Sequence, residues 1–176
     1  MNKVVLIVIV VLMSLPVLAS NMDISEVRTL YFEGWIGECG ANELVQLLSS
    51  NAPTDPVMSA YYGASIATTA NCKTWPLQKL SAFNEGKKII ENAVDSDSDN
   101  IEIRFIRFTI QSNIPSLLNY NDMEEDKKFI LERLNLQASS GVDLDLTKRI
   151  LNYMISSGEL TPGEKQNLTN LIVNNR

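Results

Sequence analysis

The chain has 176 residues, with 15 basic residues, 21 acidic residues, no histidine and a formal net charge of −6. The absence of histidine excludes Ser-His and Cys-His nucleophilic systems and removes the commonest zinc ligand. The acidic balance disfavours nucleic acid and anionic membrane surfaces as partners, because both are bound through clustered lysine and arginine.

The first 19 residues have the three-part layout of a secretory signal peptide. Lys3 precedes an unbroken apolar run, and a proline break then leads to the small residue Ala19. The run is shorter than the roughly 20 residues of a membrane-spanning helix, so we expect cleavage, with an uncleaved anchor as the alternative. Residues 20–176 would then be one domain, without membrane insertion, in the periplasm or the medium. That domain has 14 basic and 21 acidic residues and a net charge of −7.

Helix-start signals recur along the rest of the chain. Asp23, Asp99 and Thr161 are each followed three residues later by glutamate, and Asp55 precedes a proline suited to a first helical turn. The helices that we predict span residues 23–35, 41–50, 56–71, 76–95, 100–112, 123–135, 143–157 and 162–174. Their connections are short and carry glycine, proline or aspartate, which favours antiparallel hairpins within a single domain.

Residues 100–112 form a helix with two apolar faces in this interpretation. At 100° per residue the faces are Ile101, Phe105 and Phe108 on one side and Ile103, Ile106 and Ile110 on the other. Arg104, Arg107 and Gln111 form a polar stripe between them. Such a helix needs cover on both sides, which predicts an inner helix of a hairpin array. A β-strand over 101–106 is the alternative, because so short an alternation is ambiguous.

Two segments between Asp55 and Ile110 have the layout of a helical repeat. "DPVMSAYYGASIATTA" carries Gly63 where a close helix crossing requires a small residue, and "PLQKLSAFNEGKKIIENAVDSDSDNIEIRF" has the layout of a second helix, a turn and the next first helix. This run resembles tetratricopeptide-type repeats, although its spacing is longer than the family's unit of about 34 residues. The resemblance implies an all-α fold of antiparallel hairpins stacked as a short α-solenoid.

A second segment, "IRFTIQSNIPSLLNYNDMEEDKKFIL", is similar to a signature of small exported bacterial proteins of unassigned function. This resemblance implies an exported, helical protein. It implies no activity.

The chain has two cysteines, Cys39 and Cys72. In an exported protein we expect them to form a disulfide. If the first three helices run up, down and up, both cysteines lie at the same end of the bundle. Two unrelated buried thiols are the alternative, because sequence alone does not fix the required geometry.

Four residues are candidate ligand contacts. Arg104 and Arg107 could present a cationic stripe to a carboxylate-bearing ligand or a peptide terminus, because guanidinium is a planar two-pronged donor. The alternative is internal pairing with one of the nearby carboxylates Glu102, Asp122, Glu124, Glu125 and Asp126. Tyr61 and Tyr62 could line a binding groove, since tyrosine is common in interface hot spots, or could pack in the core.

Residues 95–100, "DSDSDN", resemble the start of a calcium loop, but Asn100 and Ile106 occupy the positions of its glycine and bidentate glutamate. We therefore expect a solvated turn with Asp99 capping the next helix, and no metal site.

The function predicted from the sequence is an exported interaction module that binds a protein or peptide in the bacterial envelope. The chain has no catalytic motif, so we expect neither enzymatic activity nor a cofactor. One alternative is a carboxylate-dependent envelope enzyme such as a glycan hydrolase, which would need two carboxyl groups roughly 5 to 9.5 Å apart in a cleft. The other is a purely structural envelope protein whose arginines are all paired internally.

Overall fold

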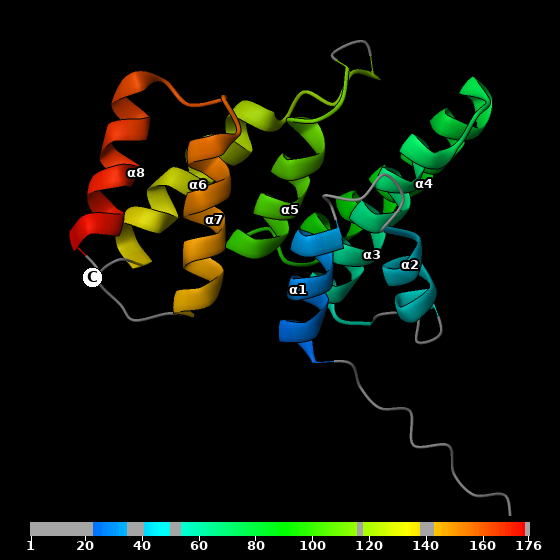
Figure 1. The fold of residues 1–176 in the computed structure, drawn as a ribbon, viewed down its shortest axis with the longest axis horizontal. Helices are drawn as coiled ribbons and strands as arrows, with labels where there is room; N and C mark the ends of the chain where they lie inside the picture. Colours follow the sequence, from blue (N-terminus) through cyan, green and yellow to red (C-terminus); the bar gives the residue numbers. More distant parts are fainter. Residues whose placement is uncertain (1–22, 35–40, 50–53, 116–117, 138–142, 175–176) are drawn as a thin grey trace, which may run out of the picture.

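A computed structural model describes residues 23–34, 41–49, 54–115, 118–137 and 143–174. Within these ranges the chain is helical and contains no strand, so the all-α prediction is confirmed. The helices are α1 (Ile24–Gly34), α2 (Ala41–Ser49), α3 (Pro56–Thr68), the 3-10 helix η1 (Thr69–Cys72), α4 (Pro76–Ser96), α5 (Ile101–Gln111), α6 (Met123–Gln137), α7 (Leu144–Ser156) and α8 (Pro162–Asn174) (Figure 1). The predicted signal peptide and Cys39 lie outside the described residues.

Most helix starts follow the predicted capping chemistry. Asp55 caps α3 by accepting a hydrogen bond from the Met58 amide at 2.9 Å. Before α8, the Glu164 carboxylate accepts from the Thr161 amide at 2.8 Å, and the Thr161 hydroxyl accepts from the Glu164 amide at 3.3 Å. These reciprocal bonds satisfy amides that have no partner within the helix.

The cap of α5 differs from the prediction. Asn100, rather than Asp99, accepts from the first-turn amides of Glu102 and Ile103, at 3.0 and 3.4 Å. The Asp99 carboxylate instead lies 3.2 Å from the guanidinium of Arg133 on α6. Aspartate and asparagine are about equally good caps, so the position was decided by tertiary context.

Helix α5 lies between α1 to α4 on one side and α6 to α8 on the other (Figure 1). All 11 of its residues are buried. The predicted faces are confirmed: Ile103, Ile106 and Ile110 belong to the core cluster shared with α1 to α4, whereas Ile101, Phe105 and Phe108 belong to the cluster shared with α6 to α8. Helix over 101–106 also excludes the alternative strand.

Helices α3 and α4 cross at two glycines. A Cβ atom added at Gly63 would lie 2.8 Å from the Gly86 carbonyl oxygen, and one added at Gly86 would lie 2.3 Å from the Gly63 carbonyl oxygen. Backbones this close leave no room for a side chain at either position. The small residue predicted at Gly63 therefore has its expected role, and it has a partner in Gly86.

Helix α1 contacts helices that are distant in sequence. Arg28 of α1 forms an ion pair with Asp143, the N-cap residue of α7, and Phe32 stacks on Phe105 of α5 with ring centroids 5.9 Å apart. In an open solenoid each hairpin contacts only its neighbours. Because α1 contacts α5 in the third hairpin and the start of α7 in the fourth, the structure does not establish solenoid stacking.

Within the described ranges, no helix combines the length and the apolar composition that are needed to cross a bilayer.

Candidate functional site

The guanidinium group of Arg107 is bound on both sides by carboxylates. Its Nε and Nη2 donate to the two carboxylate oxygens of Asp126 at 2.7 and 2.8 Å, and its Nη1 donates to Glu91 at 2.9 Å. Asp126, the fourth residue of α6, is fully buried. Burial raises the pKa of Asp126, and the hydrogen bonds from Arg107 offset only part of that rise. This two-pronged pair fixes the start of α6 against α5.

Arg104 lies one turn earlier on the same stripe. Its Nη2 donates to Glu125 at 2.6 Å, and its Nε lies 3.1 Å from Asp126 without forming a hydrogen bond. The hydrogen bond from Arg104 lowers the pKa of Glu125. Gln111 completes the stripe, and both of its amide atoms are buried without a hydrogen-bond partner. The pairing alternative for Arg104 and Arg107 is therefore what the structure shows.

A second polar stripe, between the other edges of the two apolar faces, consists of Glu102 and Thr109. Glu102 accepts from Nε and Nη2 of Arg28 at 2.6 and 2.7 Å and from the Tyr61 hydroxyl at 2.7 Å. Burial, with the adjacent Glu102 carboxylate, raises the pKa of Tyr61 well above its usual value. Thr109 shares a hydrogen bond of 2.7 Å with the Tyr31 hydroxyl.

The four predicted contact residues do not converge on one surface. Arg104 and Arg107 are 9% and 4% exposed. Tyr61 of α3 is fully buried against the second stripe, as the core-packing alternative predicted. Tyr62 is half-buried and lines a separate pocket of about 470 Å³ between α2, α3 and α4. A ligand could reach the two arginines only by displacing their carboxylates. They are better described as residues that hold α4, α5 and α6 together.

Three of the six large apolar side chains that are exposed among the described residues lie together at the start of α4. Trp75, Leu77 and Leu80 are 68%, 82% and 43% exposed and lie within a stretch of six residues. Helix α4 has 21 residues, whereas its partner α3 has 13 and is followed by η1, which also contacts α4. We call these three residues the α4 tip; in Figure 1 the start of α4 lies at the upper right.

An apolar pocket of about 350 Å³ adjoins the α4 tip. Nine of its 13 lining residues are apolar, and they come from the end of α3, η1, the start of α4, the end of α5 and the segment after α5. Phe83 and Ile110 are buried, and Leu80 belongs both to the pocket lining and to the tip. A mostly apolar concavity of this size falls within the range of ligand-binding pockets.

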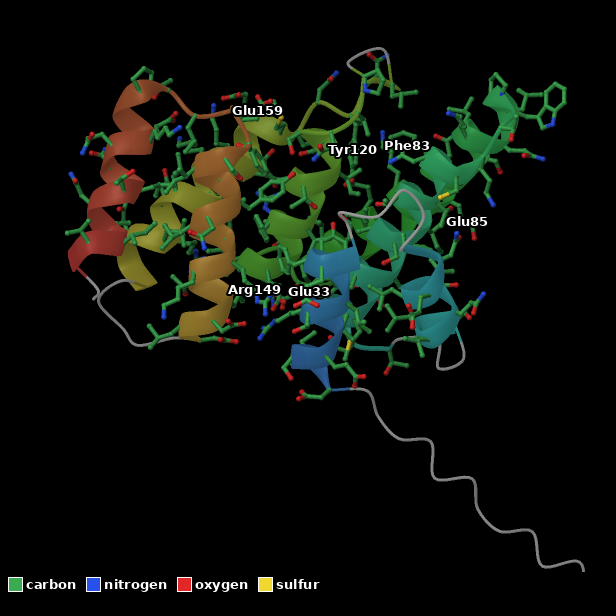
Figure 2. All side chains as sticks on the ribbon, in the orientation of Figure 1. Glu33, Phe83, Glu85, Tyr120, Arg149 and Glu159 are labelled. Carbon is green, nitrogen blue, oxygen red and sulfur yellow. The ribbon has the colours of Figure 1, made fainter. Side chains whose placement is uncertain are left out.

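The hydrogen bonds around Arg107 also support this pocket. Glu91 accepts from Arg107 and also from the hydroxyl of Tyr120, which lies on the segment between α5 and α6. The Tyr120 ring packs edge-on against Phe83, with ring centroids 6.1 Å apart. Figure 2 labels both residues. The Lys87 ammonium covers the same ring at 4.4 Å. Arg107 thus acts at a distance from the pocket, by holding the segment that forms its wall.

Positive charge borders the pocket in an otherwise acidic protein. Lys79 is the only charged residue among the described residues that line it. The N-cap residue of α4, Trp75, makes no capping hydrogen bond with its side chain, and the first turn of the helix has no acidic residue. The first amides of a helix carry a partial positive charge that an anionic group stabilises. A partner with an acidic residue beside its apolar side chains would complement this edge.

Carboxylates are scarce in the pockets. A third pocket, of about 510 Å³, lies between α1, α5 and α7. Of the described residues that line these three pockets, Glu85 is the only one with a carboxylate. The two buried carboxylates, Glu102 and Asp126, are both bound by arginine. No pair of carboxyl groups in these pockets therefore matches the arrangement that glycan hydrolysis requires. Among the described residues, no three Cys, Asp or Glu side chains gather closely enough to hold a metal ion.

The α4 tip was missed in the sequence, although a signal for it exists. Leu80 lies three residues before Phe83 and therefore on the same side of α4. The predicted helix 76–95 is also longer than the predicted helix 56–71 that precedes it. Comparing the lengths of the two helices would have indicated an uncovered apolar end.

Comparison of the chain with protein-family models, with curated proteins and with solved structures finds no match.

Proposed function

We propose that this protein is an exported interaction module of the bacterial envelope that binds an apolar peptide segment of a partner protein at the α4 tip. The observation that carries the proposal is the grouping of three exposed, large apolar side chains beside an apolar pocket. Soluble proteins seldom expose contiguous apolar surface without a binding use. Tryptophan in particular contributes more than its share of binding energy at interfaces.

The expected peptide is amphipathic and carries at least one acidic residue. Its apolar side chains would enter the pocket beside Leu80, above Phe83, and its acidic residue would lie near Lys79 and the uncapped start of α4. Burial of apolar surface stabilises such a complex by about 25 cal/mol per Å². A membrane surface is a weaker candidate, because a bilayer would make no use of a concave pocket.

Export and the hairpin scaffold belong to the same proposal. Residues 1–19 would direct secretion, and a disulfide between Cys39 and Cys72 would fix the first helices in an oxidising compartment. The stacked hairpins, arranged as a short solenoid, would hold the α4 tip in a fixed position. N-terminal sequencing of the mature protein, together with its electrophoretic mobility before and after reduction, tests export and the disulfide.

A peptide-display selection tests the binding proposal. Random peptides selected on the mature protein should share apolar residues flanked by Asp or Glu. The affinity of a consensus peptide is then measured for Leu80→Asp and Trp75→Ser, which change exposed residues and should leave the fold intact by circular dichroism. We expect each to weaken binding at least about tenfold.

Leu144→Ser is the matched control, because Leu144 is 63% exposed but lies on α7, away from the pocket. Its affinity should equal that of the unchanged chain. Equal selection of the same peptides by the Leu80→Asp variant would overturn the proposed site. Binding to phosphatidylcholine vesicles, lost in Trp75→Ser, with no selected peptide would assign the tip to a membrane surface instead.

A further inference from the structure

The pocket of about 510 Å³ between α1, α5 and α7 is separate from the α4 tip and shares no lining residue with the apolar pocket. Its walls come from both halves of the molecule. Tyr31 and Phe32 belong to α1, Thr109 to α5, and Tyr153 to α7. A cavity at the junction of two halves, with aromatic walls, is a common setting for a small-ligand site.

One arginine joins the three helices by ion pairs at their starts. Arg28, near the start of α1, binds Glu102 at the start of α5 and Asp143 at the start of α7. Hydrogen bonds from backbone amides and from Arg28 outweigh the effect of burial and lower the pKa of Asp143. Towards the other ends of α1 and α7 no such ion pair is present among the described residues, and the space between them is the pocket.

The aromatic walls are already satisfied without a ligand. The Tyr31 hydroxyl is hydrogen-bonded to the Thr109 hydroxyl. The Tyr153 hydroxyl lies 3.0 Å from the Ser112 hydroxyl and accepts a hydrogen bond from the side-chain amide of Asn113 at 2.6 Å. These bonds fix both rings, so that little order would be lost when a ligand binds. The walls therefore offer apolar ring faces rather than free hydroxyl groups.

The polar groups that can serve a ligand lie on α7. Among the described residues, Arg149 is the only charged one that lines the pocket. Asn152 and Ser156 follow it at intervals of three and four residues, on one side of the helix. Within the described part of the chain, the Asn152 side chain has no hydrogen-bond partner and Arg149 Nη1 has none. Both can therefore donate to an acceptor in the pocket.

Arg149 is positioned by three neighbours. Its Nε donates to Asp145 at 2.7 Å, its Nη2 approaches the Thr29 hydroxyl at 3.4 Å, and its guanidinium carbon lies 5.4 Å from the centroid of the Phe32 ring. Arg149 and Phe32 thus place a fixed cation beside an aromatic face. In Figure 2 the labelled Arg149 lies where α7 approaches α1. A guanidinium held in this way suits a carboxylate acceptor.

We propose that this pocket binds a small ligand that combines a carboxylate with a flat apolar ring. The carboxylate accepts from Arg149 and Asn152, and the ring lies between Phe32 and Tyr153. This inference does not depend on the peptide proposal, because the two pockets have no residue in common.

Benzoate is the probe, and benzamide, which has the same shape without the charge, is its control. Titration of the mature chain, followed by nuclear magnetic resonance, should place the shifted signals at Phe32, Thr109 and Tyr153. We expect benzoate to bind at least about tenfold more tightly than benzamide, because charge-assisted hydrogen bonds are the stronger ones. Equal affinities, or no binding of benzoate up to its solubility, would overturn the proposal.

Two variants test the assigned residues. Arg149→Gln should weaken benzoate binding at least about tenfold, and Ser156→Leu should abolish it by filling the pocket. Arg133→Gln is a matched control, because Arg133 also covers a phenylalanine ring, at 5.0 Å, and also pairs with an exposed aspartate. Shifts that move instead to Leu80 and disappear in Lys79→Gln would assign benzoate to the apolar pocket and contradict the proposal. Peptide affinity at the α4 tip should be unchanged in Arg149→Gln.

Discussion

The two polar stripes of α5 and the α4 tip both place side chains in an unfavourable environment, but only the polar stripes provide these side chains with partners. On α5, the charged side chains in the centre of the molecule are paired with partners from α1, α4 and α6. At the α4 tip, apolar side chains are exposed to solvent. The charged side chains of α5 are therefore paired inside the protein, whereas the α4 tip, which we propose as the binding surface, is apolar and exposed. Four measurements test this contrast.

The largest effect is expected from Asp126→Asn. The change removes the carboxylate shared by Arg107 and Arg104 while keeping the shape of the side chain. A buried guanidinium that loses its partner destabilises the fold, and we expect the free energy of unfolding in urea to fall by about 3 kcal/mol. Glu125→Gln, at a side chain that is 66% exposed, should change it by less than about 1 kcal/mol. A similar loss of unfolding free energy for both variants would show that the buried Arg107–Asp126 pair contributes no more than an exposed ion pair.

Gly86→Ala tests the close crossing of α3 and α4, which positions the α4 tip. The added Cβ would lie 2.3 Å from the Gly63 carbonyl oxygen and 2.5 Å from the Ala67 amide nitrogen, so α3 and α4 would have to separate. Overpacking of this kind should lower the free energy of unfolding by about 2 kcal/mol. Gly163→Ala is the control, because no heavy atom lies within 4 Å of its added Cβ. It should be neutral or stabilise α8 by up to about 1 kcal/mol.

Alkaline pH should report on the second stripe through Tyr61. Its pKa is raised in the folded chain, whereas an unfolded tyrosine ionises near pH 10. The stability that Tyr61 contributes is therefore complete below about pH 10 and is lost as the pH rises above it, by about 1.4 kcal/mol per pH unit. In Tyr61→Phe the free energy of unfolding should fall less steeply with pH by this amount. An unchanged slope would mean that Tyr61 is ionised in the folded chain.

The smallest effect, and the only expected gain, is that of Gln111→Met. The buried amide of Gln111 has no hydrogen-bond partner, and leaving such a group unpaired costs about 1 kcal/mol or more. Methionine has a similar shape without the polar atoms, so the free energy of unfolding should rise by about 1 kcal/mol. A loss of stability instead would show that a buried water molecule satisfies the amide.

Local signals in the sequence predicted the helices well. Capping residues, first-turn prolines and short connections placed every helix of the described residues to within a few positions, and the 100° periodicity separated the two apolar faces of α5. The main local difference is at 56–71, where the α-helix ends at Thr68 and η1 continues to Cys72. Such signals work because each depends on residues within one or two turns of one another.

Tertiary contacts were not predictable in the same way. The carboxylates of Asp126 and Glu125 were among the candidate partners of the two arginines, but nothing in the sequence indicated Glu91, on the preceding helix. Glu102 was expected near Arg104 and instead binds Arg28, 74 residues away. The choice depends on where α1 and α6 dock, which capping and periodicity do not determine.

The complete burial of α5 has a consequence for how the molecule unfolds. Each half of the protein uses one face of this helix as part of its own core, so neither half can keep its core if the other is lost. The two halves should therefore unfold as one cooperative unit. The backbone amides of α5 should exchange with solvent only through that global opening, more slowly than those of α8, which lies at the edge of a single cluster.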